Sequence, residues 1–429
     1  LGDAVWDTKN NLNRGDWVDL VPTVIMFTDQ SILKFYSADT WLGSYLGADH
    51  SHDILHGRIP VRTQAQANAV FTKILAYSQS PPLGAWRADG YFLADVGNVV
   101  QETQLFEGEE DAMAANFTSP WTQTKQYYAQ PPYNAPLGGN GPVEQFKADF
   151  VSHWNSAHPA VASFSGHGAF DILGNDLFFR PADVSLLNNG AYQPFFYNSD
   201  CLSGGFHAVG VDSMAEAFLQ SATGGSIGYF APAGLSFSFF ASTVSGQLFA
   251  DLFGAEKLRE LGTLTERARG ALFQQGAIAD MQGYTFVGEP ALQLVLPAPQ
   301  PPASFSVTAG NAVVNLLWTA SPDPNSVGTN LYRTQNPAQP YVKLNVSPLT
   351  GTSFSDTTVS NGTTYFYRAV SVDAAGFEGA VTNTNADCGV PGPADGPQCR
   401  RALPQNLTPP IAPQGVKVRD TGIGTVLEV

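Results

Sequence analysis

The sequence predicts an α/β domain built on a mostly parallel sheet, followed by a smaller β-sandwich. Over residues 1–297, short apolar runs alternate with amphipathic segments, which is the pattern of strand–helix–strand units. A proline-rich linker begins at Pro297, and short runs rich in β-branched and aromatic residues follow it. The chain has 429 residues, 43% of them hydrophobic, which is enough for more than one buried core.

The charge balance excludes some classes of partner. The formal net charge is −16 and charged residues make up only 14% of the chain, so a nucleic acid, which needs a basic surface, is not an expected partner. No apolar stretch reaches the roughly 18 residues that cross a bilayer. The sequence starts at Leu1 without a signal-peptide pattern, so we expect an upstream segment that completes the first domain.

Four segments of the first domain have helical periodicity, and apolar runs between them predict strands. Ser213 with Glu216, and Thr263 with Glu266, have the spacing of capping boxes, and Gly276 is a typical helix stop. The predicted helices cover 63–79, 142–155, 213–222 and 263–275. The predicted strands cover 24–26, 91–94, 161–164, 195–197, 226–230 and 291–295.

Two of these strands lead into turns of small residues that carry reactive side chains. His167 stands in Ser165–Gly168, and Cys201 follows Ser199 and Asp200. The carboxyl ends of parallel strands meet at one edge of a sheet, where α/β proteins build their sites. A thiol and an imidazole at that edge predict acyl transfer with Cys201 as nucleophile and His167 as base. The backbone N–H groups of Gly168 and Cys201 are the predicted oxyanion donors.

A third group is expected to orient the imidazole. Asp95 ends another predicted strand and is the first choice, with Asp171 and Asp200 as alternatives. His207, six residues beyond Cys201, is the only rival base. A serine nucleophile is disfavoured, because no Gly-x-Ser-x-Gly elbow is placed before a helix with a partnered acid and histidine.

The predicted reaction requires no cofactor, although two kinds of cluster suggest a metal ion. His50, His52 and His56 match no helical metalloprotease spacing, which favours a loop cluster with incidental affinity. The acidic segments 107–111 and 171–176 carry oxygen ligands of the kind that calcium prefers. A solvated acidic surface is the alternative, since no EF-hand pattern is present.

The cysteines indicate the compartment. Cys388 and Cys399 lie eleven residues apart in a segment rich in glycine and proline, which predicts a small disulfide loop and therefore an extracellular or cell-surface location. Cys201 is then the odd thiol, and its polar and glycine neighbours argue against an inert, fully buried role.

The second domain, predicted over 298–387, resembles a fibronectin type III module. Trp318 would fill its core, the Leu331–Arg333 run would be a strand, and Tyr365 would be the tyrosine-corner residue. The segment 373–376 resembles the loop before the last strand of such a module. Residues 388–429 would hold the cysteine loop, a linker and the entry strand of a further module.

The first domain resembles the gingipain-type cysteine peptidases, which have a caspase-like fold. The resemblance covers about 1–296 and rests on a set of landmarks in the family's order, namely Gly2-Asp3, 19–23, 37–41, 53–61, 165–168, 199–206, 224–228 and 287–292. It implies a secreted or surface endopeptidase with His167 as base and Cys201 as nucleophile. Several members carry calcium and trailing immunoglobulin-like domains, which matches the arrangement here.

Three functions remain open at this point. The first is an extracellular cysteine endopeptidase acting on proteins or peptides through a thioester. The second is a sortase-like transpeptidase of the same family, in which an amine resolves that thioester. The third is a catalytically idle surface protein whose β-sandwich modules mediate adhesion or cell-surface assembly.

Overall fold

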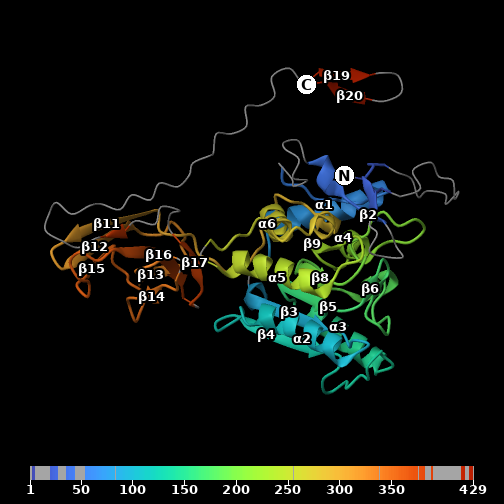
Figure 1. Cartoon of the computed structure of the whole chain (residues 1–429), viewed down its shortest axis with the longest axis horizontal. Coiled ribbons are helices and arrows are strands. Elements are labelled where there is room, and N and C mark those ends of the chain that lie inside the picture. Colours follow the sequence, from blue (N-terminus) through green and yellow to red (C-terminus); the bar gives the residue numbers. More distant parts are fainter. Residues whose placement is uncertain are drawn as a thin grey trace. The chain divides into compact units, whose positions relative to one another are not determined.

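The architecture comes from a computed structural model and consists of two compact units (Figure 1). The first comprises Leu1–Ala298 with Ala375–Phe377, and the second comprises Pro299–Ala374 with Glu378–Val429. The structure describes residues 2–4, 20–27, 35–43, 54–82, 84–254, 256–337, 339–374, 376–381, 388–389, 417–420 and 425–428.

The first unit is built on a six-stranded sheet, as the sequence predicts. Five strands run parallel and the edge strand β10 runs antiparallel to its neighbour. Across the sheet their order is β10 (Tyr284–Gly288), β9 (Gly228–Pro232), β8 (Phe195–Ser199), β5 (Val161–Ser165), β3 (Asp89–Ala94) and β4 (Thr122–Tyr127). The carboxyl ends of β3, β5, β8 and β9 therefore share one edge.

Helices cover both faces of this sheet. They are α1 (Gln64–Gln79), α2 (Val100–Ala114), α3 (Val143–Ser156), α4 (Met214–Gln220), α5 (Ser238–Phe253), α6 (Leu261–Gln274) and α7 (Ile278–Gly283). Within the described ranges, no helix combines the length and the apolar character that crossing a membrane requires. Three 3₁₀ turns lie at Asp39–Leu42, Ala85–Ala88 and Pro181–Leu186.

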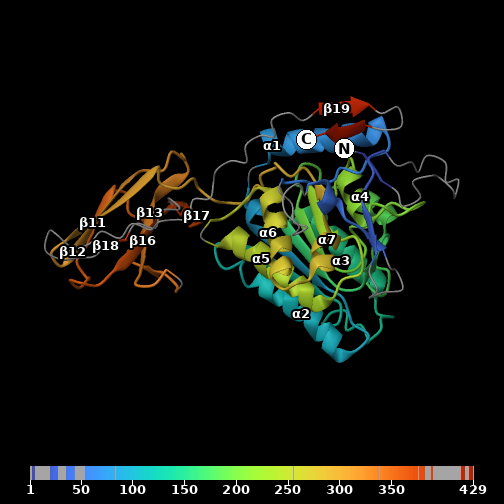
Figure 2. The ribbon, with the colours of Figure 1, turned by 45° about the horizontal axis from the view of Figure 1, so that its top comes forward.

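Alternating side chains of β3 identify the faces that the helices cover. Tyr91 stacks on Phe150 of α3, whereas the next residue, Phe92, packs against Phe249 of α5. Successive side chains of a strand point to opposite faces, so α3 and α5 lie on opposite faces of the sheet. The α2 and α6 helices pack against α5, which places them in the same layer (Figure 2).

Buried polar contacts join the amino-terminal segments to the sheet. The guanidinium of Arg58 makes two 2.7 Å bonds to the carboxylate of Asp39 and donates to the carbonyls of Gly2 and Val21. It also lies over the ring of Phe206, 4.6 Å from the centroid. One buried side chain thus connects several of the landmarks that carry the family resemblance.

Two predicted elements are wrong: a helix cap is misplaced, and a strand is absent. The predicted cap at Thr263 lies inside α6, because Glu260 is the N-cap and Thr263 donates a hydrogen bond back to it. The predicted strand at 291–295 is absent, and Gln293 makes only an isolated bridge to Glu260. The capping box at Ser213 and Glu216 is confirmed.

The second unit is a β-sandwich with two antiparallel sheets. One contains β11 (Ser304–Gly310), β12 (Val313–Thr319) and β15 (Ser353–Asp356). The other contains β13 (Ser326–Thr334), β14 (Val342–Lys343), β16 (Tyr365–Asp373), β17 (Glu378–Val381) and β18 (Cys388–Gly389). A separate hairpin pairs β19 (Lys417–Asp420) with β20 (Thr425–Glu428).

The core of the sandwich contains the residues expected of a fibronectin type III module. Trp318 and Leu331 are both buried in it. The hydroxyl of Tyr365 accepts a hydrogen bond from the backbone N–H of Ser360, as in a tyrosine corner. The predicted loop at 373–376 begins with the last residue of β16, Asp373, and β17 starts at Glu378, while Ala375 lies outside the described residues.

Candidate active site

The two predicted reactive turns lie side by side at the carboxyl edge of the sheet. The register of β5 and β8 pairs Ser165 with Ser199, and the His167 and Cys201 turns begin directly after them. Both residues line one cavity of about 240 Å³. The other described lining residues are Glu102, Phe106, Gly166, Ser199, Asp200, Ser236, Phe237, Ser238 and Ala241.

Cys201 is half-buried, and its thiol is free. The Sγ atom donates a hydrogen bond to the carbonyl of Ser236 at 3.6 Å. Burial, followed by the nearby charges of Asp200 and Asp280, raises the pKa of the thiol. The next residue, Leu202, adopts a left-handed backbone with φ of 70°, which makes the turn after β8 sharp.

The imidazole of His167 is held by α2, a helix that the sequence analysis did not predict. Its Nε2 atom lies 3.4 Å from Glu102 Oε2 and 3.1 Å from Asn98 Nδ2. The Glu102 carboxylate also accepts from the backbone N–H of Asn98 at 2.6 Å. One helical turn further on, Phe106 packs its ring edge-on against the imidazole at 5.4 Å.

Asp95 lies at the end of β3, but its recorded hydrogen bonds are to backbone and not to the imidazole. Its carboxylate accepts from the N–H groups of Val96, Asn175 and His167, the last at 3.3 Å. Burial raises the pKa of Asp95 to about 6, although these bonds and the charge of His167 oppose the shift. Among the described contacts, Asp95 anchors the backbone of His167, and Glu102 is the carboxylate near the ring. The role of Asp95 as the third catalytic group stays a prediction.

The two alternatives for the third group have other contacts. Asp171 lies 3.8 Å from the guanidinium of Arg180. Asp200 is buried, which raises its pKa well above the usual range, and it accepts a hydrogen bond from Ser203. A Cβ atom at Gly168 would lie 2.5 Å from Asp200 Oδ2, so only glycine fits at this place in the turn.

The rival base His207 is excluded from the cavity. It is fully buried, packs against the rings of Phe170 and Phe206, and lines none of the cavities described here. Burial lowers its pKa to about 4, so it remains neutral near pH 7.

The predicted metal and disulfide sites are only partly within the described residues. In that part of the chain, no group of three or more His, Cys, Asp or Glu side chains is arranged to hold a metal ion. Asp111 pairs with Lys125, and Asp176 accepts from the hydroxyl of Tyr128. His50, His52, Cys399 and the side chain of Cys388 lie outside the described residues.

Two buried carboxyl groups lie beneath the cavity. Glu109 of α2 accepts hydrogen bonds from Ser199 at 2.7 Å and Ser165 at 3.1 Å, the residues that precede the two reactive turns. Its neighbour Glu110 accepts from Ser163 and Ser165. Burial raises the pKa of Glu109 to about 7. The sequence signal for these contacts was two short strands that end in serine, Ser165 and Ser199, together with the acidic segment 107–111.

The arrangement supplies the parts that acyl transfer requires. It provides a thiol and, at the same cavity, an imidazole that is held near a carboxylate. Each part comes from a different element, so the sheet edge and α2 must both be in place to assemble them.

Comparison with known proteins identifies a family and a similar fold. The sequence pattern described as Peptidase family C25 matches residues 1–295. The fold is similar to the crystal structure of the Arg-specific cysteine proteinase gingipain R, with a TM-score of 0.51 and 15% identity over 81% of this chain and 78% of that one. A complex of the RgpB pro- and mature domains from Porphyromonas gingivalis gives a TM-score of 0.50 and 15% identity, covering 83% and 81%.

Curated relatives match only a short part of the chain. An amylopullulanase from Thermoanaerobacterium saccharolyticum is 35% identical over 105 residues, which is 24% of this chain and 8% of that protein. The chain thus spans less than a tenth of that relative, and the match says nothing about a shared activity. The family match instead covers more than half of the chain, so the protein belongs to peptidase family C25 and is a cysteine peptidase.

Proposed function

We propose that this cysteine peptidase is an endopeptidase in which Cys201 is the nucleophile and His167 is the general base. The observation that carries the proposal is that the two side chains line the same cavity at the carboxyl edge of the sheet. Cys201 is also the free cysteine among the described residues.

The proposed reaction begins with transfer of the thiol proton to His167. We assign Nδ1 as the base, because the carboxylate of Glu102 at Nε2 favours the tautomer that carries its proton there. In that tautomer the Asn98 amide, whose nitrogen lies 3.1 Å from Nε2, turns so that its oxygen accepts from Nε2–H. The sulfur then forms a bond to the substrate carbonyl carbon. As the C–N bond breaks, the imidazolium returns its proton to the leaving amine. A water molecule, deprotonated by His167, finally hydrolyses the thioester and frees Cys201.

The tetrahedral intermediate carries a negative charge on the former carbonyl oxygen. We assign the backbone N–H groups of Gly168 and Cys201 as its hydrogen-bond donors. One such donor contributes about 3–4 kcal/mol of transition-state stabilisation. The support for this role is the position of both residues in the two turns that follow β5 and β8.

We also propose a basic residue at P1, the residue whose carbonyl is attacked. The carboxylate of Glu102 lines the cavity, and the Glu109 carboxyl lies behind Ser199 of the cavity wall. No lysine or arginine occurs among the described lining residues. A similar solved structure is of an Arg-specific proteinase, which supports the same preference.

The proposed function is tested by hydrolysis of fluorogenic peptides with arginine at P1. We expect the full chain to cleave them, Cys201→Ala to abolish cleavage, and His167→Ala to lower kcat by on the order of a thousandfold. His158→Asn is the matched control. It removes an imidazole outside the cavity, at a residue whose φ of 57° asparagine tolerates.

Two outcomes of these assays would contradict the proposal. Cleavage that persists in Cys201→Ala, or that falls as much in His158→Asn as in His167→Ala, would assign the chemistry to other residues.

We further propose that the peptidase acts outside the cytoplasm, on protein or peptide substrates. The support is the sequence, in which Cys388 and Cys399 have the spacing of a small disulfide loop. The β-sandwich unit is of a kind suited to assembly at a cell surface.

A further inference from the structure

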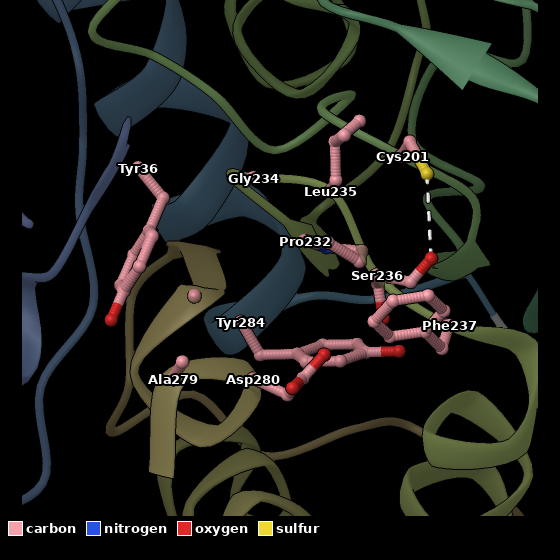
Figure 3. A pocket seen from close by; sticks show the side chains of 11 residues that line it. Tyr36, Cys201, Pro232, Gly234, Leu235, Ser236, Phe237, Ala279, Asp280 and Tyr284 are labelled. Atoms are coloured by element: carbon pink, nitrogen blue, oxygen red, sulfur yellow. Dashed lines mark hydrogen bonds between the residues drawn. The ribbon is translucent and has the colours of Figure 1, made fainter. Parts of the chain in front are cut away.

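A second pocket opens on the side of Cys201 that faces away from His167. It contains about 150 Å³ and is lined by Cys201 together with residues that follow β9 and residues of α7 (Figure 3). His167 follows β5 and Cys201 follows β8, which lies between β5 and β9 in the sheet. The imidazole and this pocket are therefore on opposite sides of the nucleophile.

One carboxylate gives this pocket its charge. Asp280, on the first turn of α7, is half-buried and lines the pocket. Burial is the main cause that raises the pKa of Cys201, Tyr36 and Tyr284, and the charge of Asp280 adds to it. Both tyrosines also line the pocket. Within the described part of the chain, Asp280 forms no ion pair, and no lysine or arginine lines the pocket.

The rest of the lining is apolar or aromatic. Leu235 and Phe237 form part of one wall, and Tyr36 lies on the other side (Figure 3). Lysine and arginine side chains have an apolar stem and a charged head, which suits an apolar pocket that holds a single carboxylate. About 10–15 Å³ of cavity volume holds one water molecule. The pocket, with about 150 Å³, therefore has room for the charged head group of a lysine or arginine side chain.

We propose that this pocket is a substrate subsite that binds a basic side chain at P2, the residue preceding P1, through an ion pair with Asp280. The inference rests on the proposed function. His167 protonates the leaving amine, so the leaving-group side of the substrate lies toward the imidazole. The P1 side chain occupies the His167 cavity, and the acyl chain that precedes P1 leads past Cys201 to the pocket of Asp280. Ser236 and Phe237 line both pockets and form the boundary between them. Together with a basic P1, the enzyme would select pairs of basic residues.

A purely structural role for Asp280 makes a different prediction. An acidic residue in the first turn of a helix is stabilised by the backbone N–H groups there. If that were its only role, replacing it would lower the melting temperature without changing which peptides are cleaved. Substrate discrimination therefore distinguishes the two roles.

The test compares four peptides with arginine at P1 and arginine, lysine, glutamine or leucine at P2. For the full wild-type chain we expect kcat/KM about tenfold or more higher with a basic P2 than with glutamine, as for a hydrogen bond to a charged group. In Asp280→Asn this ratio falls close to one. The matched control Asp111→Asn removes the same charge from an exposed position outside the pocket and keeps the wild-type ratio.

Two outcomes would overturn the subsite and leave the proposed function standing. One is equal cleavage of the P2-arginine and P2-glutamine peptides by the wild type. The other is an unchanged preference in Asp280→Asn.

A binding measurement tests the subsite without turnover. Calorimetry with an uncleaved Arg-Arg peptide would compare Cys201→Ala with Cys201→Ala/Asp280→Asn. About tenfold weaker binding by the double variant supports the subsite, and equal binding overturns it.

Discussion

At the scale of single residues, the imidazole of His167 depends on side chains that lie far away in the sequence. Glu102 contacts Nε2, Phe106 packs against the ring, and Asp95 binds the backbone N–H. Each contact restrains a different part of the residue: its tautomer, its ring plane and its main chain. This division predicts different consequences for the loss of each side chain.

Replacing Glu102 with glutamine should lower kcat on the order of a hundredfold while KM changes little. The amide can donate to Nε2 and so removes the preference for a base at Nδ1. Steady-state kinetics on a P1-arginine peptide measures both constants. A rise in KM with kcat unchanged would show that Glu102 binds substrate and does not position the base.

Glu109 should make the stability of the first unit depend on pH. Its pKa is raised from 4.5 to about 7 by burial, so the folded protein holds this proton more tightly than the unfolded chain. The resulting stabilisation is fully present below pH 4.5 and is lost as the pH rises through about 7. Relative to Glu109→Gln, the wild type should lose on the order of 3 kcal/mol of unfolding free energy between pH 4.5 and pH 8.

Denaturant unfolding at several pH values measures this difference. Glu144→Gln is the control, because that side chain is exposed and its replacement should leave the pH dependence unchanged. A difference in unfolding free energy between wild type and Glu109→Gln that stays constant from pH 4.5 to pH 8 would contradict this prediction.

The sequence was sufficient to predict that His167 and Cys201 lie at the same edge of the sheet, because each closely follows a buried strand. It was not sufficient for Glu102, which lies 65 residues before His167 (167 − 102) and reaches the ring only through the packing of α2. Asp95 was placed correctly at its strand end. Its hydrogen bonds could not be predicted, because they depend on how the loop that contains Asn175 folds back.

At the scale of elements, α2 was not predicted although it shapes the cavity. Val99, its N-cap, makes no side-chain capping bond, and its buried face includes the charged residues Glu109 and Glu110. Such a face does not give the apolar periodicity that identifies a helix in a sequence. Three serines on the sheet satisfy these carboxyl groups, and that compensation is visible only in the fold.

Arg58 should be a major support of the amino-terminal segments. Arg58→Met leaves the Asp39 carboxylate buried without its partner, which should destabilise the first unit by about 3–5 kcal/mol. Denaturant unfolding measures the change. The double variant Arg58→Met/Asp39→Asn should recover part of this loss. Equal stabilities of the single and double variants would show that the ion pair is not the cause.

At the scale of the whole molecule, the acidic character of the chain continues into the active site. The ionisable residues lining the two pockets beside Cys201 are acidic, apart from His167, Cys201 and two tyrosines. An acidic surface attracts basic peptides and repels acidic ones. Cleavage should therefore slow as ionic strength rises, mainly through a higher KM for substrates with two basic residues.

The order of the two units could be predicted from the change in sequence texture at Pro297. The cysteine loop beyond them stays a prediction. A tryptic digest without reductant should contain a peptide pair joined through Cys388 and Cys399, which mass spectrometry identifies, and Cys201 should remain free. Two free thiols at 388 and 399 in protein purified from its own host would contradict the predicted disulfide, on which the extracellular assignment rests.

The measurement that tests the central claim most directly is covalent labelling by a thiol-reactive peptide with arginine at P1. The full chain is treated with the probe, and mass spectrometry locates the adduct. We predict a single adduct on Cys201 in the wild type, none in Cys201→Ala, and labelling at least a hundredfold slower in His167→Ala. Labelling of Cys201 at the same rate without His167, or no labelling of a folded wild-type chain, would contradict the proposed dyad.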